Sequence, residues 1–435
     1  MQISQISSLE LGNYLRLKRK EQNYRLEDLA DENISVSTIS NIELGKTNVA
    51  EDKRHYLIHK LGIEETELTK LIATQRSHRE DIKWKLESVE HILDLDHHKG
   101  WKKLKQIQLE KTDPFMTIVN YLKAKYYIRI RDWEKATKSL YEAIRILESN
   151  PDIKHINLFS ACQYELSRVS YFTNNLEQAL RCVEVGLENF ILDGERLYYR
   201  DILLVGKAIY SERLNKIDEV IRVLDELWPR VYQLESHEVA LGVFEIRIKT
   251  LIKLKKYEEA IECAKQGLRM ARLNRQHERS FELWVYLGEI YIHVNEWEFA
   301  ENCFLNALDI EIKKRYLLIT AYTQLSKLYI KQNRMDEARH LIEKAIVIGN
   351  ETNSRFALID LLITLGDCYY EQDSLDDAIE KYNSALQLAR EEMSLKQEKE
   401  VLFRICKCEN HLSKDQFQKH LEDYFRVEVR LQATD

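Results

Sequence analysis

Two stretches with the same pattern decide the fold: WVYLGEIYIHVNEWEFAENCFLNA at residues 284–307 and LITLGDCYYEQDSLDDAIEKYNSA at residues 362–385. In each, a Leu-Gly pair is followed by Tyr, and then by an Ala, an aromatic residue and a second Ala. The spacings of three, four and seven residues place these side chains on one face of a helix. The pattern therefore predicts two packed helices in each stretch.

The second half of this pattern recurs along most of the chain. Small or β-branched residues lie 43, 41, 40, 40, 38 and 40 residues apart, at Ala136, Ala179, Val220, Ala260, Ala300, Ala338 and Ala378. Seven residues after each lies a second small or apolar residue, namely Ala143, Gly186, Leu227, Gly267, Ala307, Ala345 or Ala385. Seven residues is about two helical turns, so each pair shares a stripe that a neighbouring helix can approach closely.

Composition agrees with a chain built from helices. Its 435 residues include only 12 Gly and 3 Pro, which argues against an open α/β enzyme with many glycine-containing turns. The net charge of −7 excludes a strongly basic nucleic-acid coat. We find no signal peptide and no run of 18 apolar residues. Seven cysteines without a CxxC pair indicate buried thiols in a reducing compartment.

The repeated spacings resemble the tetratricopeptide repeat, most closely in the units of Ala300 and Ala378. The resemblance implies an all-α protein with a right-handed solenoid of helix pairs. Further pairs are expected at residues 80–111 and 396–430, the latter as a polar-faced cap. Pro114 fits a helix start, Pro151 a connection between helices, and Pro229 the end or a kink of a helix.

The first 66 residues are expected to form a separate domain, joined by a linker at 67–79 to the repeats at 80–435. We expect short helices at 9–22, 26–32, 36–44 and 51–61. Ser35 is a natural N-cap for the third, and Gly45 supplies its C-terminal stop. Two helices joined by a tight turn, with Ala30, Ile39 and Ile42 packed inside, make a helix-turn-helix.

This region resembles the XRE/Cro/λ-repressor class of DNA-binding domain, chiefly through ISVSTISNIELGK at residues 34–46. The resemblance implies that the third helix enters the major groove and that double-stranded DNA is contacted by Val36, Ser37, Thr38, Asn41 and Lys46. The Asn41 amide is suited to pair bidentately with adenine. The resemblance also implies a structural ion pair between Arg16 and Glu43. At the start of the second helix, where the family usually has a Gln that contacts DNA, this chain has Leu26.

The charge of the N-terminal domain (residues 1–66, called the head below) makes a single head a weak DNA binder. Residues 1–65 hold nine Lys and Arg against eleven Asp and Glu, and neutralisation of the DNA backbone supplies much of the affinity. The basic run Arg16, Lys18, Arg19, Lys20 and Arg25 is either a solvated helix face or a phosphate contact. We therefore expect two heads on two half-sites, and hence a homo-oligomer, either a dimer or a tetramer.

The inner wall of the solenoid offers a groove. The inward positions of the tetratricopeptide frame predict a peptide site at Lys125, Arg129, Tyr164, Arg168, Tyr171, Arg213, Lys249 and Glu289. The same frame places Phe172, Glu245, Lys253, His293, Lys327, Lys331, Asp367, Tyr370 and Glu371 on this wall. Such a lining suits an extended peptide, and the alternative is a solvated wall of mixed charge.

A helix-turn-helix followed by a long array resembles the RRNPP family of peptide-pheromone receptors, which includes NprR and PlcR. The length looks most like the NprR branch, because PlcR-like members have shorter arrays. The resemblance implies a cytoplasmic quorum-sensing transcription regulator that binds a short signalling peptide in the groove and DNA through its head. The family often clamps its peptide with asparagines, and none of the inward positions is Asn. The alternative is a scaffold or inhibitor that holds a partner such as a response regulator.

Motifs for catalysis and cofactors are missing. The sequence has no G-x-x-x-x-G-K-[ST], G-x-G-x-x-G or G-x-S-x-G. His55 and His59 are four residues apart but lack the Glu of a zinc motif. We therefore expect no enzyme, no cofactor, no metal and no membrane partner.

Overall fold

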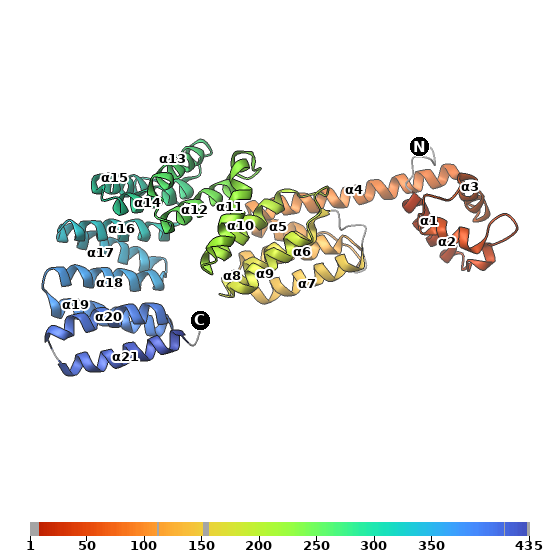
Figure 1. The fold of residues 1–435 in the computed structure, drawn as a ribbon. Helices are drawn as coiled ribbons and strands as arrows, with labels where there is room; N and C mark the ends of the chain where they lie inside the picture. The colour runs from red at the N-terminus through yellow and green to blue at the C-terminus, as the bar shows by residue number, and fades with distance from the viewer. Residues whose placement is uncertain (1–7, 111–112, 151–155, 413, 433–435) are drawn as a thin grey trace. The chain divides into compact units, whose positions relative to one another are not determined.

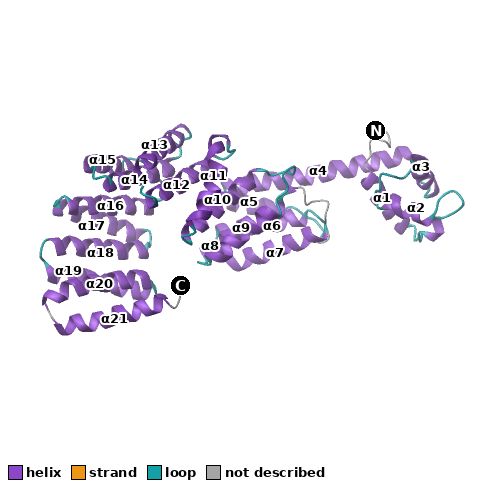
Figure 2. Ribbon diagram, in the orientation of Figure 1, coloured by secondary structure: helices purple, strands orange, loops and turns teal. Residues whose placement is uncertain are grey.

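The computed structural model describes residues 8–110, 113–150, 156–412 and 414–432. Figure 2 shows helices joined by loops, and these residues contain no strand. None of their helices is long and apolar enough to cross a membrane. The chain divides into two compact units, Met1–Lys154 and His155–Asp435. The expected all-helical class is confirmed.

The N-terminal unit begins with four short helical elements around one core. These are α1 (Ser8–Glu21), the 3-10 helix η2 (Glu27–Leu29), α2 (Val36–Glu43) and α3 (Glu51–Lys60). Apolar side chains from all of them are buried together, including those of Leu15, Leu29, Ile39, Ile42 and Leu57. Ala30 packs against this core while partly buried.

The expected second helix at 26–32 is wrong in extent, because only a single 3-10 turn forms there. The Asp31 carboxylate accepts hydrogen bonds from the backbone N–H groups of Asn33 and Ile34. An aspartate that caps the backbone just ahead of it favours a turn over a continuing helix. Tyr56 and Lys60 of α3 bind the same carboxylate and hold the pKa of Asp31 well below its usual range.

A long helix follows where a linker was expected. Residues 67–79 lie inside α4 (Glu65–Leu95), which continues through 31 residues without a break. No Gly or Pro occurs between Gly62 and Gly100, so nothing in the sequence stops this helix. Asp96 then caps α5 (His97–Leu104) by accepting from the N–H of Lys99.

Helix pairs make up the rest of the chain. In the N-terminal unit, α4 and α5 contact one another where a pair was expected at residues 80–111, and α6 (Met116–Arg129) pairs with α7 (Trp133–Ser149). The first helices of the pairs in the C-terminal unit are α8 (Leu158–Phe172), α10 (Tyr198–Arg213), α12 (His237–Lys253), α14 (His277–His293), α16 (Leu318–Lys331), α18 (Arg355–Glu371) and α20 (Leu395–Leu412). The second helices are α9 (Leu176–Glu188), α11 (Ile217–Leu227), α13 (Tyr257–Leu273), α15 (Trp297–Leu308), α17 (Met335–Glu351), α19 (Leu375–Glu391) and α21 (Lys414–Gln432).

Each pair packs as the repeat register predicts. All fourteen small or apolar positions, from Ala136 and Ala143 to Ala378 and Ala385, are buried. Each first helix contacts its own second helix, and consecutive first helices of the C-terminal unit also contact one another. Figure 1 shows the stacked order for α16 to α21. We call the side lined by first helices the inner face and the side lined by second helices the outer face.

Left-handed residues close the turn without glycine in the seven pairs from α6–α7 to α18–α19. The residue two positions before each of the seven second helices α7 to α19 has φ between 56° and 62°; these residues are Arg131, Asn174, Asn215, Lys255, Asn295, Asn333 and Asp373. Backbone hydrogen bonds such as Lys255 N–H to Ile252 and Lys256 N–H to Leu251 complete a Schellman motif at each site. Asn and Asp tolerate this conformation better than other residues with a Cβ, so the array folds with little glycine.

The remaining local expectations are mostly confirmed. Pro114 lies two residues before α6, and Pro229 lies in a 3-10 turn (η4, Trp228–Gln233) that follows α11. Pro151 lies outside the described residues. All seven cysteines are buried free thiols. The expected terminal pair is α20 and α21, where buried Glu409 accepts from His420 Nδ1 at 2.8 Å and most of α21 remains exposed.

Candidate functional site

Helix α2 is held by caps at both ends. The Ser35 hydroxyl accepts from the Thr38 N–H at 3.2 Å and lies within hydrogen-bond distance of the Ser37 and Thr38 hydroxyls. At the other end Gly45 has φ 71°, and its N–H donates to the Ile42 carbonyl. Both predicted caps are confirmed, and they fix the direction of α2 before any ligand is present.

The residues predicted to contact DNA lie on or just beyond α2. Val36, Ser37 and Lys46 are exposed, whereas Thr38 and Asn41 are half-buried. Within the described residues, the Asn41 carboxamide makes no hydrogen bond and Lys46 forms no ion pair. The hydroxyls of Ser37 and Thr38 already belong to the cap. Asn41 is therefore the side chain whose hydrogen-bonding capacity is most available for a base.

The structural ion pair of the head involves a different arginine from the one expected. Arg19, not Arg16, donates to Glu43, from Nε to Oε1 at 2.6 Å and from Nη2 to Oε2 at 2.9 Å. Arg19 lies four residues after Leu15 on the buried face of α1, while Arg16 is exposed. The hydrogen bond with Glu43 raises the pKa of Arg19.

The ion pair between Arg19 and Glu43 also removes one cation from the basic run that could contact phosphate. Arg19 is structural, and Lys18 pairs with Glu21 at 2.8 Å. Arg16, Lys20 and Arg25 remain exposed. The surface charge available for phosphate is therefore smaller than the sequence indicates.

In the N-terminal unit, one of the two predicted peptide contacts is already satisfied. The Lys125 ammonium lies 3.2 Å from Glu90 and 2.9 Å from Asp94 of α4, and its side chain is 12% exposed. Arg129, at the end of α6, is exposed. Sequence spacing could not reveal the carboxylates of α4, because they lie more than 30 residues away.

Three of the four predicted contacts on α8 and α10, namely Tyr164, Arg168 and Tyr171, are similarly engaged. Arg168 binds the buried Glu165 at 2.8 Å, and this carboxylate raises the pKa of Arg168. Its guanidinium also lies 5.9 Å from the centre of the Tyr164 ring. Tyr171 packs against Tyr210 with ring centres 5.6 Å apart. Arg213 is exposed at the end of α10.

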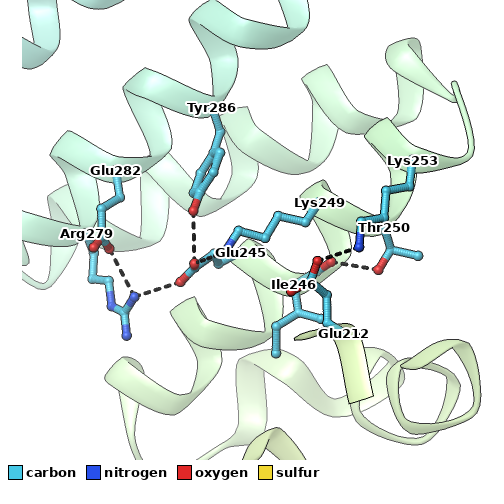
Figure 3. Close-up of polar contacts among 9 residues, drawn as sticks. All are labelled: Glu212, Glu245, Ile246, Lys249, Thr250, Lys253, Arg279, Glu282 and Tyr286. Carbon is cyan, nitrogen blue, oxygen red and sulfur yellow. Dashed lines mark hydrogen bonds and ion pairs between the residues drawn. The ribbon is translucent and has the colours of Figure 1, made fainter. Parts of the chain in front are cut away.

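A polar network covers the inner face of α12 and α14. Glu245 accepts from Lys249 at 2.6 Å, from Arg279 at 2.9 Å and from the Tyr286 hydroxyl at 3.0 Å (Figure 3). Burial disfavours the charged form of Glu245, but the two cations outweigh burial and its pKa is lowered. Lys249 is therefore engaged, and Lys253 is likewise bound to Glu212 at 2.6 Å.

Glu289, the last predicted peptide contact, follows this network along α14. Its carboxylate accepts from the Gln324 amide at 2.9 Å. Burial raises its pKa, with Lys249 and Lys327 acting in the opposite direction.

A pocket of about 530 Å³ opens beyond Glu289, between α16, α18 and α20. It gathers five of the inward positions expected from the repeat frame: Lys327, Lys331, Asp367, Tyr370 and Glu371. Phe403, Arg404 and Lys407 of α20 complete it, and these were missed because α20 was taken only as a cap. Extending the repeat frame by one more unit would have included them.

The charges of this pocket are partly unsatisfied. Asp367 accepts from Arg404 at 2.7 Å and from the Tyr382 hydroxyl at 2.7 Å. Within the described residues, Lys327, Lys331 and Lys407 form no ion pair, although Lys407 lies 4.3 Å from the centre of the Tyr370 ring. The pocket therefore presents three cations beside an aromatic ring, an arrangement that can bind a carboxylate attached to an apolar group.

Metal chemistry finds no support in the described part of the chain. No group of three or more His, Cys, Asp or Glu side chains there could hold an ion. His55 and His59 are therefore not part of such a group.

Comparison with known proteins agrees with the repeat architecture. Tetratricopeptide repeat profiles match residues 249–272 and 317–391. Tetratricopeptide repeat protein 29 of Homo sapiens is 24% identical over 265 residues, which are 57% of this chain and 54% of that protein. ETO1-like protein 2 of Arabidopsis thaliana is 28% identical over 39% of this chain and 16% of that protein. The chain thus spans under two thirds of the length of these curated relatives.

Solved structures share the fold at low identity. The apo form of the quorum sensor NprR from B. thuringiensis superposes with a TM-score of 0.62 at 15% identity, over 80% of this chain and 99% of that one. A Rap protein complexed with competence and sporulation factor gives 0.59 at 14%, over 82% and 100%. NprR with its cognate peptide NprX gives 0.53 at 14%, over 82% and 99%. The chain has the tetratricopeptide solenoid fold of these receptors.

Proposed function

We propose that the chain is a peptide-responsive transcription regulator. The observation that carries this proposal is the inner-face pocket of α16, α18 and α20, whose three lysines form no ion pair within the described residues. A short peptide with a free C-terminal carboxylate and an apolar side chain supplies what these lysines and Tyr370 require. The likeness to NprR supports the same class of ligand, because NprR has been solved with a cognate peptide.

The peptide contacts proposed here differ in part from those expected from the sequence. Lys125, Arg168 and Lys249 are held by carboxylates of this chain. A peptide could engage them only by replacing an existing ion pair, which costs desolvation. Lys331 and Lys407 form no ion pair with the part of the chain that the structure describes, so we assign the peptide's carboxylate to them.

Lys331→Gln combined with Lys407→Gln is expected to weaken peptide binding by at least tenfold. Each charge-assisted hydrogen bond contributes about 1.5–3 kcal/mol. The measurement is native mass spectrometry of the full chain with a library of heptapeptides having free C-terminal carboxylates, followed by calorimetry of the best binder. Lys344→Gln, an exposed lysine on the outer face of α17, is the control. Equal affinity of the amidated and free-acid forms would contradict the proposed role of these lysines.

We further propose that α2 binds double-stranded DNA and that the protein works as a homodimer. The Asn41 amide, which makes no hydrogen bond to the described residues, supports base recognition. The acidic balance of residues 1–65 supports the need for two heads. Peptide binding would then change the separation or orientation of the two heads, provided that the peptide prefers one arrangement of the repeats over another.

Asn41→Ala is expected to reduce affinity for a selected DNA sequence by about 10–100-fold and to leave non-specific binding unchanged. This follows from the 1–3 kcal/mol that a bidentate base contact provides. Randomised duplexes would first be enriched on the wild-type chain, and affinities would then be measured at one fixed salt concentration. Asn48→Ala, at an exposed asparagine after α2, is the matched control. If the Asn41 variant enriches the same sequence with the same affinity, the base-reading role is wrong.

A further inference from the structure

A furrow of about 900 Å³ lies on the outer face of the C-terminal unit, away from the inner-face pocket. Its walls come from α13 and α15, and its floor comes from α14. The α15 wall is 12 residues long, whereas the α13 wall has 17. On the α14 floor between them, Trp284 and Tyr291 are only partly buried.

The floor of the furrow is apolar and has helical spacing. Trp284, Leu287 and Tyr291 recur at i, i+3 and i+7 and line the furrow from one face of α14. Phe299, on the α15 wall, is 56% exposed. Leu287 is itself buried, with 3% of its surface exposed, so the apolar surface within reach of a ligand is offered by Trp284, Tyr291 and Phe299.

One wall carries a row of cations. Lys265, Arg269 and Arg272 lie at i, i+4 and i+7 on α13, and all three are exposed. Within the described residues, none of them forms an ion pair. The row extends over about 10 Å, given a rise of about 1.5 Å per residue. In a chain with a net charge of −7, such a row is a local reversal of sign.

We propose that this furrow receives an acidic amphipathic helix from a partner protein. A helix laid along α14 would place apolar side chains at i, i+3 and i+7 over Trp284, Leu287 and Tyr291. Its carboxylates, at i, i+4 and i+7 like the cations, would then face Lys265, Arg269 and Arg272. A small amphiphile has a single head group and would use only one cation of the row. The furrow is separate from the inner face, so such a partner could bind while a peptide is present.

The experiment uses fluorescein-labelled 16-residue helical peptides and the full chain. Each peptide has Glu at i, i+4 and i+7 on one side of an apolar stripe whose three residues vary among Leu, Ile, Met, Phe and Trp. A matched panel has Lys in place of Glu. Fluorescence anisotropy is expected to show at least one Glu peptide that binds tenfold more tightly than its Lys counterpart, with affinity falling as salt is raised. Failure of every Glu peptide to bind at 1 mM overturns the proposal.

Charge reversal then locates the site. Arg269→Glu with Arg272→Glu is expected to weaken the best Glu peptide at least tenfold and to strengthen its Lys counterpart. Lys344→Glu with Lys419→Glu changes net charge equally at exposed sites elsewhere and is the control. Thermal unfolding of both double variants checks that they remain folded. Asn302→Trp places a large side chain in the furrow from its α15 wall and is a second variant expected to block the peptide. Equal loss of affinity in both double variants, or displacement of the peptide by dodecanoate at lower concentration than by unlabelled peptide, overturns the proposal.

Discussion

Arg19→Ala is expected to lower the free energy of unfolding of the α1–α3 region by about 3–5 kcal/mol, the usual effect of removing one partner of a buried ion pair. The variant leaves the Glu43 carboxylate, 5% exposed, without its two hydrogen bonds from the guanidinium. The Tyr24 carbonyl also loses the Arg19 Nη1 donor at 2.8 Å. Hydrogen exchange followed by mass spectrometry would report this as lost protection of the α1 and α2 amides.

Two further variants make this prediction specific. Arg16→Ala removes an exposed arginine from the same helix, and we expect it to change stability by less than about 0.5 kcal/mol. Replacing both partners, as Arg19→Met with Glu43→Leu, is expected to restore most of the protection, since an apolar pair of similar volume often replaces a buried ion pair without loss. If Arg16→Ala and Arg19→Ala had equal effects, the assigned ion pair would be wrong.

Gly366→Ala is expected to destabilise the C-terminal unit by about 1–3 kcal/mol, even though Ala is the better helix former. A Cβ at Gly366 would lie 2.3 Å from Cε1 of Tyr382, a ring that is 1% exposed and cannot move freely. The Tyr382 hydroxyl is also fixed by its hydrogen bond to Asp367. Urea unfolding monitored by circular dichroism would measure the change.

Gly242→Ala provides the opposite result on another first helix. A Cβ there would meet only Cγ1 of Val205 at 3.4 Å, which is an ordinary contact. We therefore expect the substitution to stabilise the unit by about 0.5–1 kcal/mol through helix propensity. Destabilisation by both substitutions would show that helix packing at these glycines is tighter than the contacts indicate.

The fold was largely predictable because the repeat is a packing pattern. Ala260 or Ala338 must be small wherever a second helix approaches its neighbours, so its spacing carries the architecture directly. The length of α15 was not predictable in the same way. Its small residues Ala300 and Ala307 keep the register, but they do not reveal that the helix ends at Leu308 or that a furrow lies beside it.

The candidate sites were harder to predict because a charge matters only through its partner. Lys125 and Arg129 lie one turn apart on α6, yet carboxylates of α4 pair with the first while the second is exposed. Long-range pairs of this kind have no sequence spacing. Arg168 is different, since Glu165 lies three residues before it and a helical i, i+3 rule could have found the pair.

The length of helix α4 sets both the distance and the rotation between the groups at its two ends. Its 31 residues, at about 1.5 Å and 100° each, rise about 45 Å. Inserting one residue would advance everything beyond it by about 1.5 Å and turn it through about 100°, whereas seven residues would nearly restore the angle. A change in the length of this helix therefore alters the rotation between the groups at its ends much more than their separation. Only insertions close to whole turns would keep those groups oriented as they are.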